Sequence, residues 1–238
     1  MMELSIVMPV YNEAGVLASS LDEALSTVVK ASYPCEILLV DDASSDQSFE
    51  ILQEYQKRYP QTIRVLRHQS NRGIMGALKT LFSEARGRYI FFNSSDGQFR
   101  TSDVLRMMDL RDSYDLIVGQ RKQKLYNMRR HLVSWFFNFL PKVFFGVETY
   151  DAGSVKLYRA DVLKIPLISQ SPFREAERII RAKKLGFRVG AIPVIHYQRR
   201  AGRATGAEWK LLAESCKDLF RCWVVLDVFS TRPKEIAG

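Results

Sequence analysis

The first half of the chain alternates short apolar runs with longer stretches in which apolar residues recur every three or four positions. Short apolar runs next to chain breakers predict strands, and the 3.6-residue period predicts helices. The pattern predicts strands at 6–9, 36–40, 63–66, 89–92 and 115–118, and helices at 14–30, 45–59, 73–84 and 102–110. Strands separated by helices of this length indicate an α/β fold with a mostly parallel central sheet flanked by helices.

The second half of the chain is less regular. It predicts an aromatic-rich helix, a basic amphipathic helix and a long final helix, with three short strands between them. The helices are expected at 125–145, 173–185 and 206–229, and the strands at 154–158, 187–189 and 192–196. No repeat or long linker divides the chain, so we expect one domain over 1–205 followed by a C-terminal helix within 206–238.

Charge is distributed unevenly along the 238 residues. Residues 1–120 contain 12 Lys and Arg against 16 Asp and Glu, a net charge of −4, whereas residues 121–238 contain 23 against 10, a net charge of +13. This asymmetry indicates two different ligand surfaces, and a solvated basic surface explains the composition equally well. The basic residues do not form a known nucleic-acid reading module, so no nucleic-acid partner is expected.

Three features of the sequence predict a cytoplasmic protein that is soluble or peripheral at a membrane. No apolar run approaches the ~18 residues of a membrane span. The N-terminal residues resemble a strand rather than a signal peptide. The three cysteines are scattered, as is typical of a reducing compartment, and the three histidines form no ligand cluster.

Polar residues follow three of the predicted strands, where parallel sheets bind their ligands. They are the segment Pro9–Glu13, the pair Asp41 and Asp42, and the segment Asn93–Gln98. A carboxylate after the second strand can accept hydrogen bonds from a base or from ribose hydroxyls. Helix capping is the alternative, and it explains Ser45 but not the paired aspartates. Asp96 can bind a divalent cation that bridges a diphosphate, although turns also use aspartate freely.

The order of these motifs resembles that of family-two, GT-A-fold inverting glycosyltransferases. The resemblance rests on Pro9-Val10-Tyr11-Asn12-Glu13, Val40–Asp46, Asn71-Arg72-Gly73 and Ser94–Gln98. In the second half, five further segments resemble the branch that contains dolichol-phosphate mannose synthase and polyprenyl-phosphate glycosyltransferases. They are Gly119–Arg121, Arg130 with Ser134, Asp151–Ser154, Glu177 before Arg181–Phe187, and Ile192–Val194. The resemblance extends from about residue 4 to residue 205.

This resemblance implies a Rossmann-like GT-A domain whose 1–120 half binds the nucleotide-sugar and whose 121–205 half binds a polyprenyl phosphate. It implies that the nucleotide is held by Pro9, Tyr11, Glu13, Asp41 and Asp42. It implies that the metal, the diphosphate and the reacting centre face Asp96 and Gln98. It implies that the acceptor phosphate or donor diphosphate meets Arg121, Arg130 and Ser134. The donor and acceptor loops would contribute Asp151, Glu177, Arg200 and Arg203.

The metal loop departs from the family pattern. The family usually has Asp-X-Asp, and here Ser94 takes the place of the first aspartate. A hydroxyl is a weaker ligand than a carboxylate, so we expect Mg²⁺ or Mn²⁺ to bind with reduced affinity through Asp96, diphosphate oxygens and water. The departure also leaves open a nucleotide-sugar-binding protein that has lost catalysis.

The acceptor distinguishes two further hypotheses. A phosphate monoester is largely a dianion at neutral pH and attacks without a dedicated base, whereas a hydroxyl acceptor needs one. Asp151, Glu175 and Glu177 are the acids available as that base. The aromatic segment 132–145 either lies in a membrane interface or belongs to the core. The motifs do not specify the sugar, the nucleotide or the oligomeric state.

Overall fold

The protein is described by a computed structural model that covers residues 1–122, 138–198 and 209–228. A seven-stranded sheet forms its centre, in the order β3-β2-β1-β4-β6-β5-β7. The strands are β1 (Leu4–Val10), β2 (Cys35–Asp41), β3 (Ile63–Arg67), β4 (Tyr89–Phe92), β5 (Leu116–Arg121), β6 (Lys156–Arg159) and β7 (Val189–Val194). The helices are α1 (Ala14–Lys30), α2 (Ser48–Arg58), α3 (Gly73–Glu84), α4 (Asp103–Met108), α6 (Ala160–Leu163), α7 (Arg174–Lys184) and α8 (Trp209–Trp223), which continues as a π-helix over Val224–Val228.

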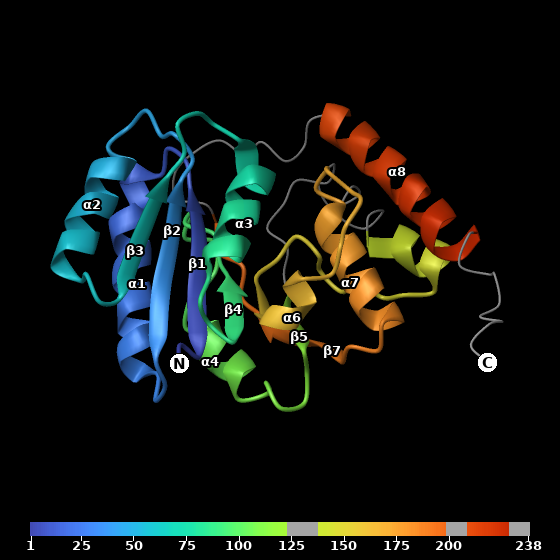
Figure 1. Cartoon of the computed structure of the whole chain (residues 1–238), viewed down its shortest axis with the longest axis horizontal. Helices are drawn as coiled ribbons and strands as arrows, with labels where there is room; N and C mark the ends of the chain where they lie inside the picture. Colours follow the sequence, from blue (N-terminus) through green and yellow to red (C-terminus); the bar gives the residue numbers. More distant parts are fainter. Residues whose placement is uncertain (123–137, 199–208, 229–238) are drawn as a thin grey trace, which may run out of the picture.

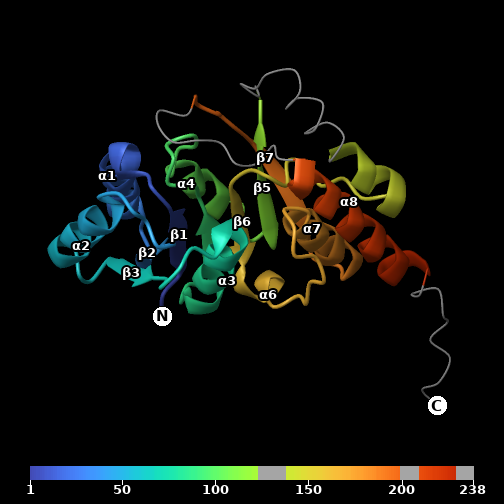
Figure 2. The same ribbon diagram turned by 90° about the horizontal axis from the view of Figure 1, so that it is seen from above.

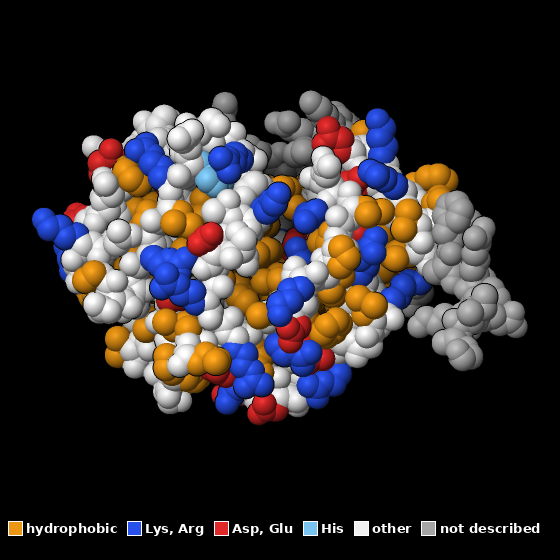
Figure 3. Space-filling model, viewed as in Figure 1, with side chains coloured by type: hydrophobic (Ala, Val, Ile, Leu, Met, Phe, Trp, Pro, Cys, Tyr) orange, Lys and Arg blue, Asp and Glu red, His pale blue; other side chains and the backbone are white. Residues whose placement is uncertain are grey.

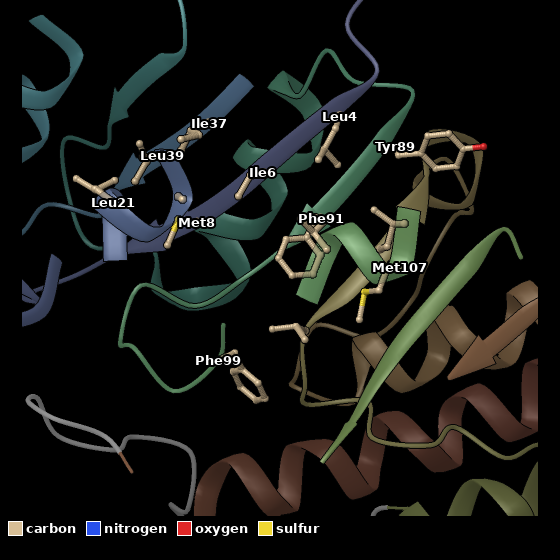
Figure 4. Close-up of a cluster of buried hydrophobic side chains, with 14 of the residues drawn as sticks. Leu4, Ile6, Met8, Leu21, Ile37, Leu39, Tyr89, Phe91, Phe99 and Met107 are labelled. Carbon is tan, nitrogen blue, oxygen red and sulfur yellow. The ribbon is translucent and has the colours of Figure 1, made fainter. Parts of the chain in front are cut away.

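Helices cover both faces of the sheet, as Figure 1 and Figure 2 show from two directions. Helices α1, α2 and α4 pack on one face, and α3, α6 and α7 pack on the other. Alternation along β1 explains the two cores, because Ile6 and Met8 point to the α1 side while Val7 points to α3. Figure 4 shows the α1-side cluster around Ile6, Met8 and Phe91. The α/β fold with a mostly parallel sheet and flanking helices is thereby confirmed.

Strand β6 is the exception to the parallel arrangement. It pairs antiparallel with β4 and β5, whereas β7 pairs parallel with β5. The start of β6 therefore lies at the same edge of the sheet as the carboxyl ends of β4 and β5. The antiparallel direction of β6 therefore places the segment before β6 at the edge of the sheet where the polar motifs of the first half lie.

The element predictions differ from the structure in three places. The two strands expected at 187–189 and 192–196 are one strand, β7, which runs through Pro193. A proline is tolerated there because β7 is the edge of the sheet and needs no ladder donor on its outer side. Helix α2 begins at Ser48, so Ser45 does not cap it. The short helix α6 was not expected.

The aromatic segment expected as a helix is helical over residues 138–145, and residues 123–137 lie outside the description. Residues 138–145 pack with α7 and α8 in a separate apolar cluster that includes Phe145, Phe173 and Leu219. Figure 1 shows α8 on the outer side of α7, away from the sheet. Among the helices of the described ranges, none combines the length and the apolar character that a membrane span requires.

Candidate active site

The sheet register brings the predicted functional segments to one edge. Val10 at the end of β1 is level with Asp41 at the end of β2. Phe92 at the end of β4 is level with Lys156 at the start of β6, and Lys156 is level with Val118 of β5. The loops that follow β1, β2, β4 and β5 and the loop that precedes β6 therefore converge there. Ligands bind at this edge in open α/β sheets.

The loops after β1 and β2 are joined by side-chain hydrogen bonds. Asn12 has a φ of 55°, and its Oδ1 accepts the Ser45 backbone N–H at 2.8 Å. The Ser44 hydroxyl accepts the Asn12 N–H at 3.0 Å, and the Ser48 hydroxyl accepts the Glu13 N–H at 2.9 Å. The local sequence predicted Ser45 as a helix cap, whereas its backbone is used to join two loops.

Asp41 lies at the floor of this double loop with no exposed surface. Its Oδ1 accepts the Ser44 N–H at 3.3 Å, and its Oδ2 lies 3.1 Å from Nε of Arg67. The Arg67 guanidinium carbon lies 3.9 Å from the centre of the Phe49 ring. Tyr11, the aromatic residue of the first motif, is half exposed. Asp41, Arg67 and Phe49 bring together an acceptor, a cation and an aromatic ring, a set suited to a nucleobase.

Asp42 is engaged by a different segment. Its Oδ1 lies 2.6 Å from Nδ1 of His68 and accepts the backbone N–H of Arg72 at 2.9 Å. The other ring nitrogen of His68 lies 2.9 Å from the Thr80 hydroxyl. With the proton on Nδ1, Asp42 therefore anchors the 68–72 loop against α3. His68 was not predicted to take part, because no motif in the sequence signals this contact.

The loop after β4 is built around Asp96. Its Oδ1 accepts the Ser94 hydroxyl at 2.6 Å and the Gln98 N–H at 3.1 Å. Gly97 has a φ of 70°, a conformation that glycine adopts without strain. The Ser95 hydroxyl donates to the Pro9 carbonyl at 2.7 Å, which ties this loop to the end of β1. Asp96 is thus held at the junction of the first and fourth strands.

The donor set fits a cation only in part. In the described residues no group of three or more His, Cys, Asp or Glu is arranged to hold a metal. Ser94 donates its hydroxyl hydrogen to Asp96, and Asp96 is the one carboxylate between 93 and 98. Mg²⁺ and similar ions are commonly bound by one carboxylate together with substrate phosphates and water. The loop fits that open kind of site and not a closed protein cage.

The segment after β7 packs against the same loop. Nε2 of Gln98 lies 3.2 Å from Nε2 of the buried His196, and the Tyr197 N–H donates to the Gln98 carbonyl at 2.9 Å. The His196 and Phe99 rings lie 5.3 Å apart. A cavity of about 530 Å³ opens beside these residues, between the loop and Ser20 of α1. His196 belongs to no sequence motif, and for that reason it was not among the predicted site residues.

Arg121 and Asp151 form a buried, bidentate ion pair. Nε of Arg121 donates to one carboxylate oxygen of Asp151 and its terminal nitrogen donates to the other, both at 2.5 Å. The side chains are 8% and 3% exposed. The guanidinium also lies 6.0 Å from the Phe99 ring. The structure therefore brings together two residues that the resemblance placed in the site, 30 positions apart in the chain.

Glu177 does not join this group. It lies fully buried in α7, where one oxygen accepts Ile168 N–H at 3.0 Å and Arg181 Nε at 2.6 Å, and the other accepts Ser169 N–H at 2.8 Å. These bonds hold the chain before α7. The remaining expected residues, Arg130, Ser134, Arg200 and Arg203, lie outside the described residues.

Comparison with known proteins agrees with this arrangement. The family model for glycosyl transferase family 2 matches residues 5–165. The chain is 31% identical over 210 residues to dodecaprenyl-phosphate galacturonate synthase of Rhizobium johnstonii, covering 84% of this chain and 61% of that protein. It is 28% identical over 211 residues to undecaprenyl-phosphate 4-deoxy-4-formamido-L-arabinose transferase of Edwardsiella ictaluri, covering 88% and 64% respectively. The chain thus spans less than two thirds of the length of either relative.

A solved structure supports the fold. The mannosyltransferase PcManGT from Pyrobaculum calidifontis, in complex with GDP-Man and Mn²⁺, superposes with a TM-score of 0.63 at 18% sequence identity. The match covers 99% of this chain and 66% of that one. At this identity the likeness establishes the GT-A fold expected from the motifs, and it does not extend to the ligands.

Proposed function

Because this chain belongs to glycosyl transferase family 2, we propose that it is an inverting glycosyltransferase that moves a sugar from a nucleotide-sugar to a polyprenyl phosphate. The named relatives support the acceptor, since both are enzymes of polyprenyl-phosphate sugar transfer. The cluster of Asp41, Arg67 and Phe49 supports the proposal that the nucleotide binds on the side of β1 and β2. The Asp96 loop then faces the diphosphate, and the Arg121–Asp151 pair faces the acceptor.

The observation that carries this proposal is the pairing of the three acids available as a general base. Asp151 accepts two bonds from Arg121, and Glu177 accepts three bonds from α7 and the preceding chain. Glu175 accepts the Tyr158 hydroxyl at 2.5 Å and lies 3.4 Å from Nε of Arg178. Carboxylates held by cations are poor proton acceptors. A phosphate dianion needs no such base, so the arrangement favours a phosphate acceptor over a hydroxyl.

The reaction then follows from the charges at the edge. An oxygen of the acceptor phosphate forms a bond to the anomeric carbon while the bond from that carbon to the nucleoside diphosphate breaks on the opposite side. The configuration at that carbon is inverted, and the electron pair leaves with the diphosphate. Positive groups stabilise both anions best when they are fixed before the reaction. Arg121 is such a group, since Asp151 and Phe99 fix its orientation.

A divalent cation is part of this proposal. Asp96 would hold it together with diphosphate oxygens and water, and the cation would neutralise charge on the leaving group. The PcManGT structure was solved in complex with Mn²⁺, which is consistent with divalent metal use in the fold. Ser94 would not act as a charged ligand, so we expect weak metal binding.

We also propose that the protein is cytoplasmic and sits at the membrane surface. Four large apolar side chains of residues 138–145, α8 and its extension are exposed by about half: Phe139, Val143, Phe220 and Val225. The Phe144 and Trp223 rings lie 5.5 Å apart in the apolar cluster that residues 138–145 form with α7 and α8. Such a pair of helices fits the interface of a bilayer, where a lipid acceptor resides.

The test is an assay with a panel of nucleotide-sugars, with and without a polyprenyl phosphate. We expect sugar to appear on the lipid only when both substrates are present. Arg130→Lys should impair transfer far more than nucleotide binding, because lysine cannot reproduce the bidentate binding of a phosphate by a guanidinium group. Arg129→Lys is the matched control and should matter less. An active enzyme whose acceptor is a free sugar hydroxyl would refute the proposal, as would nucleotide-sugar binding without transfer.

A further inference from the structure

Lys156, the first residue of β6, is a buried lysine that has no role in the proposed reaction. It is 1% exposed. Its neighbours across the sheet are Phe92 of β4 and Val118 of β5. Phe92 leads into the Asp96 loop, and Val118 leads to Arg121. Lys156 therefore lies between the two strands that carry the proposed catalytic groups.

The amino group of Lys156 reaches back to the turn that precedes its own strand. Nζ donates to the Ser154 carbonyl at 2.9 Å. The Ser154 N–H in turn donates to the Asp151 carbonyl at 2.9 Å, which closes the turn over 151–154. The Asp151 side chain, in turn, accepts hydrogen bonds from the Arg121 guanidinium. A chain of bonds thus leads from a buried amine to the ion pair at the edge.

Charge balance does not account for a lysine at this position. Glu175 is already paired with Arg178 and accepts the Tyr158 hydroxyl, and Nζ of Lys156 lies 3.7 Å from it. Burial lowers the pKa of the Lys156 ammonium, although the Glu175 and Asp151 carboxylates oppose this change. Because Arg178 and Tyr158 still hold Glu175, loss of the lysine charge leaves this carboxylate with partners.

Cationic side chains also surround the cavity that adjoins Glu175. Glu175 and Arg178 line this cavity of about 390 Å³ between α3, α6 and α7, whose wall also includes Lys79, Lys164 and Arg174. Figure 3 shows Lys and Arg side chains around the hollow between α3 and α7. The charges of Arg178 and Arg121 also lower the pKa of Lys156, so a lysine retained at this interior position calls for a reason other than folding stability.

We propose that Lys156 is a positioning residue, whose buried amino group holds the 151–154 turn and through it the orientation of the Asp151–Arg121 pair toward the acceptor phosphate. This role rests on the proposed transfer reaction. Lys156 is buried beneath the edge, so we expect it to act through the Asp151–Arg121 pair and not by contact with the substrates. We expect it to affect the rate of transfer and not the binding of the nucleotide-sugar, because the proposed nucleotide-binding residues lie on β2, β3 and the loops after β1 and β2.

The test compares Lys156→Met with Tyr158→Phe. Methionine keeps an unbranched chain of similar length and leaves Glu175 paired with Arg178. We expect Lys156→Met to melt at or above the wild-type temperature. Hydrogen–deuterium exchange should become at least tenfold faster at the amides of 151–155. The turnover number kcat should fall about 10- to 100-fold with KM for the nucleotide-sugar within about twofold, because small misplacements of reacting groups have effects of this size.

Tyr158→Phe is the control, since it removes a bond to Glu175 but leaves the bond from Lys156 to Ser154. We expect it to lower stability while leaving exchange at 151–155 and kcat near wild type. The proposal is overturned if Lys156→Met exchanges like wild type, or if both variants change the exchange and the rate equally. Exchange and melting need no substrate, so a wild-type protein without transfer activity refutes the proposed function and leaves this test of positioning intact.

Discussion

The edge of the sheet is built differently in its two regions. On the side of β1 and β2, carboxylates accept backbone N–H groups, as Asp42 does from Arg72, and the arginine that pairs with Asp41, Arg67, is half exposed. On the side of β5 and β6, Asp151 pairs with Arg121, and both side chains are buried. A loop held by backbone donors and a half-exposed arginine leaves polar groups open to a ligand. A site held by buried ion pairs depends on both partners for its stability.

Both regions contain residues other than glycine in the left-handed conformation. Asn12 and Ala43 have positive φ values of 55° and 60° in the loops after β1 and β2, and Tyr150, next to Asp151, has a φ of 56°. Such a conformation is uncommon for residues other than glycine and persists where surrounding bonds enforce it. The regions therefore differ in the burial of their ion pairs and not in backbone strain. We expect substitution of the carboxylates to change ligand binding in the first region and folding stability in the second.

The largest effect is expected at the ion pair. Asp151→Asn leaves the Arg121 guanidinium buried without its counter-ion, which typically costs about 3–5 kcal/mol of unfolding free energy. Urea denaturation followed by circular dichroism measures this change. The exposed Asp161→Asn is the control, and it should stay within about 1 kcal/mol of wild type. An Asp151→Asn variant that unfolds at the wild-type urea concentration would contradict the proposed contrast.

Asp96→Asn should act on catalysis instead. Loss of its charge should lower kcat by about 10²- to 10³-fold, the range seen when one group that stabilises developing charge is removed. Its unfolding free energy should change little, since Ser94 and Gln98 can still donate to the amide oxygen. Asp103→Asn in α4 serves as the control for loss of a negative charge. Equal transfer rates for Asp96→Asn and wild type would remove Asp96 from the reaction.

Asp41→Ala tests the nucleotide side. The variant should bind UDP or GDP more weakly by roughly 1.5–3 kcal/mol, the usual contribution of hydrogen bonds to a charged group. Isothermal titration calorimetry gives the affinity, and circular dichroism confirms that the fold is intact. Asp112→Ala, on the exposed surface, is the control. Unchanged nucleotide affinity in a folded Asp41→Ala protein would exclude Asp41 from the site.

Ser94→Asp sharpens the comparison by placing a second carboxylate in the Asp96 loop, which a hydrogen bond ties to the end of β1. It should tighten Mn²⁺ binding about tenfold, or ~1.4 kcal/mol, because a second charged ligand joins Asp96. Equilibrium dialysis in the presence of a nucleoside diphosphate measures the affinity. Transfer by the wild type should then need high metal concentrations or survive partly in chelator. Tight Mn²⁺ binding by the wild type, with no gain from Ser94→Asp, would show that the weak-ligand interpretation of Ser94 is wrong.

The smallest effect is a pH dependence at the opposite edge of the sheet, where Asp115 directly precedes β5. Burial by itself would raise the pKa of Asp115, but hydrogen bonds from Arg188 and the charges of Arg159 and Arg188 hold it below its ordinary value. The folded pKa is then lower than the unfolded one, near ~4. The resulting stability is present above that pH and is lost as the pH falls through the folded value.

Asp115→Asn should therefore lose less stability than wild type on going from pH 7 to pH 3, because the substituted side chain no longer titrates. Urea denaturation at the two pH values measures this difference. Asp109→Asn, which changes the same charge on the surface after α4, is the control. Identical acid sensitivity in Asp115→Asn and wild type would show that the arginines do not act on the Asp115 carboxylate as described.

The local pattern of the chain was enough to predict most of the first half of the fold. Helices α1 and α3 begin and end where the apolar periodicity predicted, because each buries one continuous stripe against the sheet. The strand-end motifs were located as well, since a parallel sheet places every such end at one edge. Where prediction failed, a long-range contact had replaced a local preference. Ser45 is used by Asn12, and Pro193 is accommodated by the sheet edge.

The sequence by itself determined the fold class, the family and the positions of Asp41, Asp96, Arg121 and Asp151, because periodicity and motif order are local properties of the chain. Only the tertiary structure decided which partners each group has. It assigned Asp42 to His68, Gln98 to His196, Glu177 to the chain before α7, and Lys156 to the 151–154 turn. The reason is physical: a buried polar group must find its partner within hydrogen-bond distance, and packing alone sets which residues are that close.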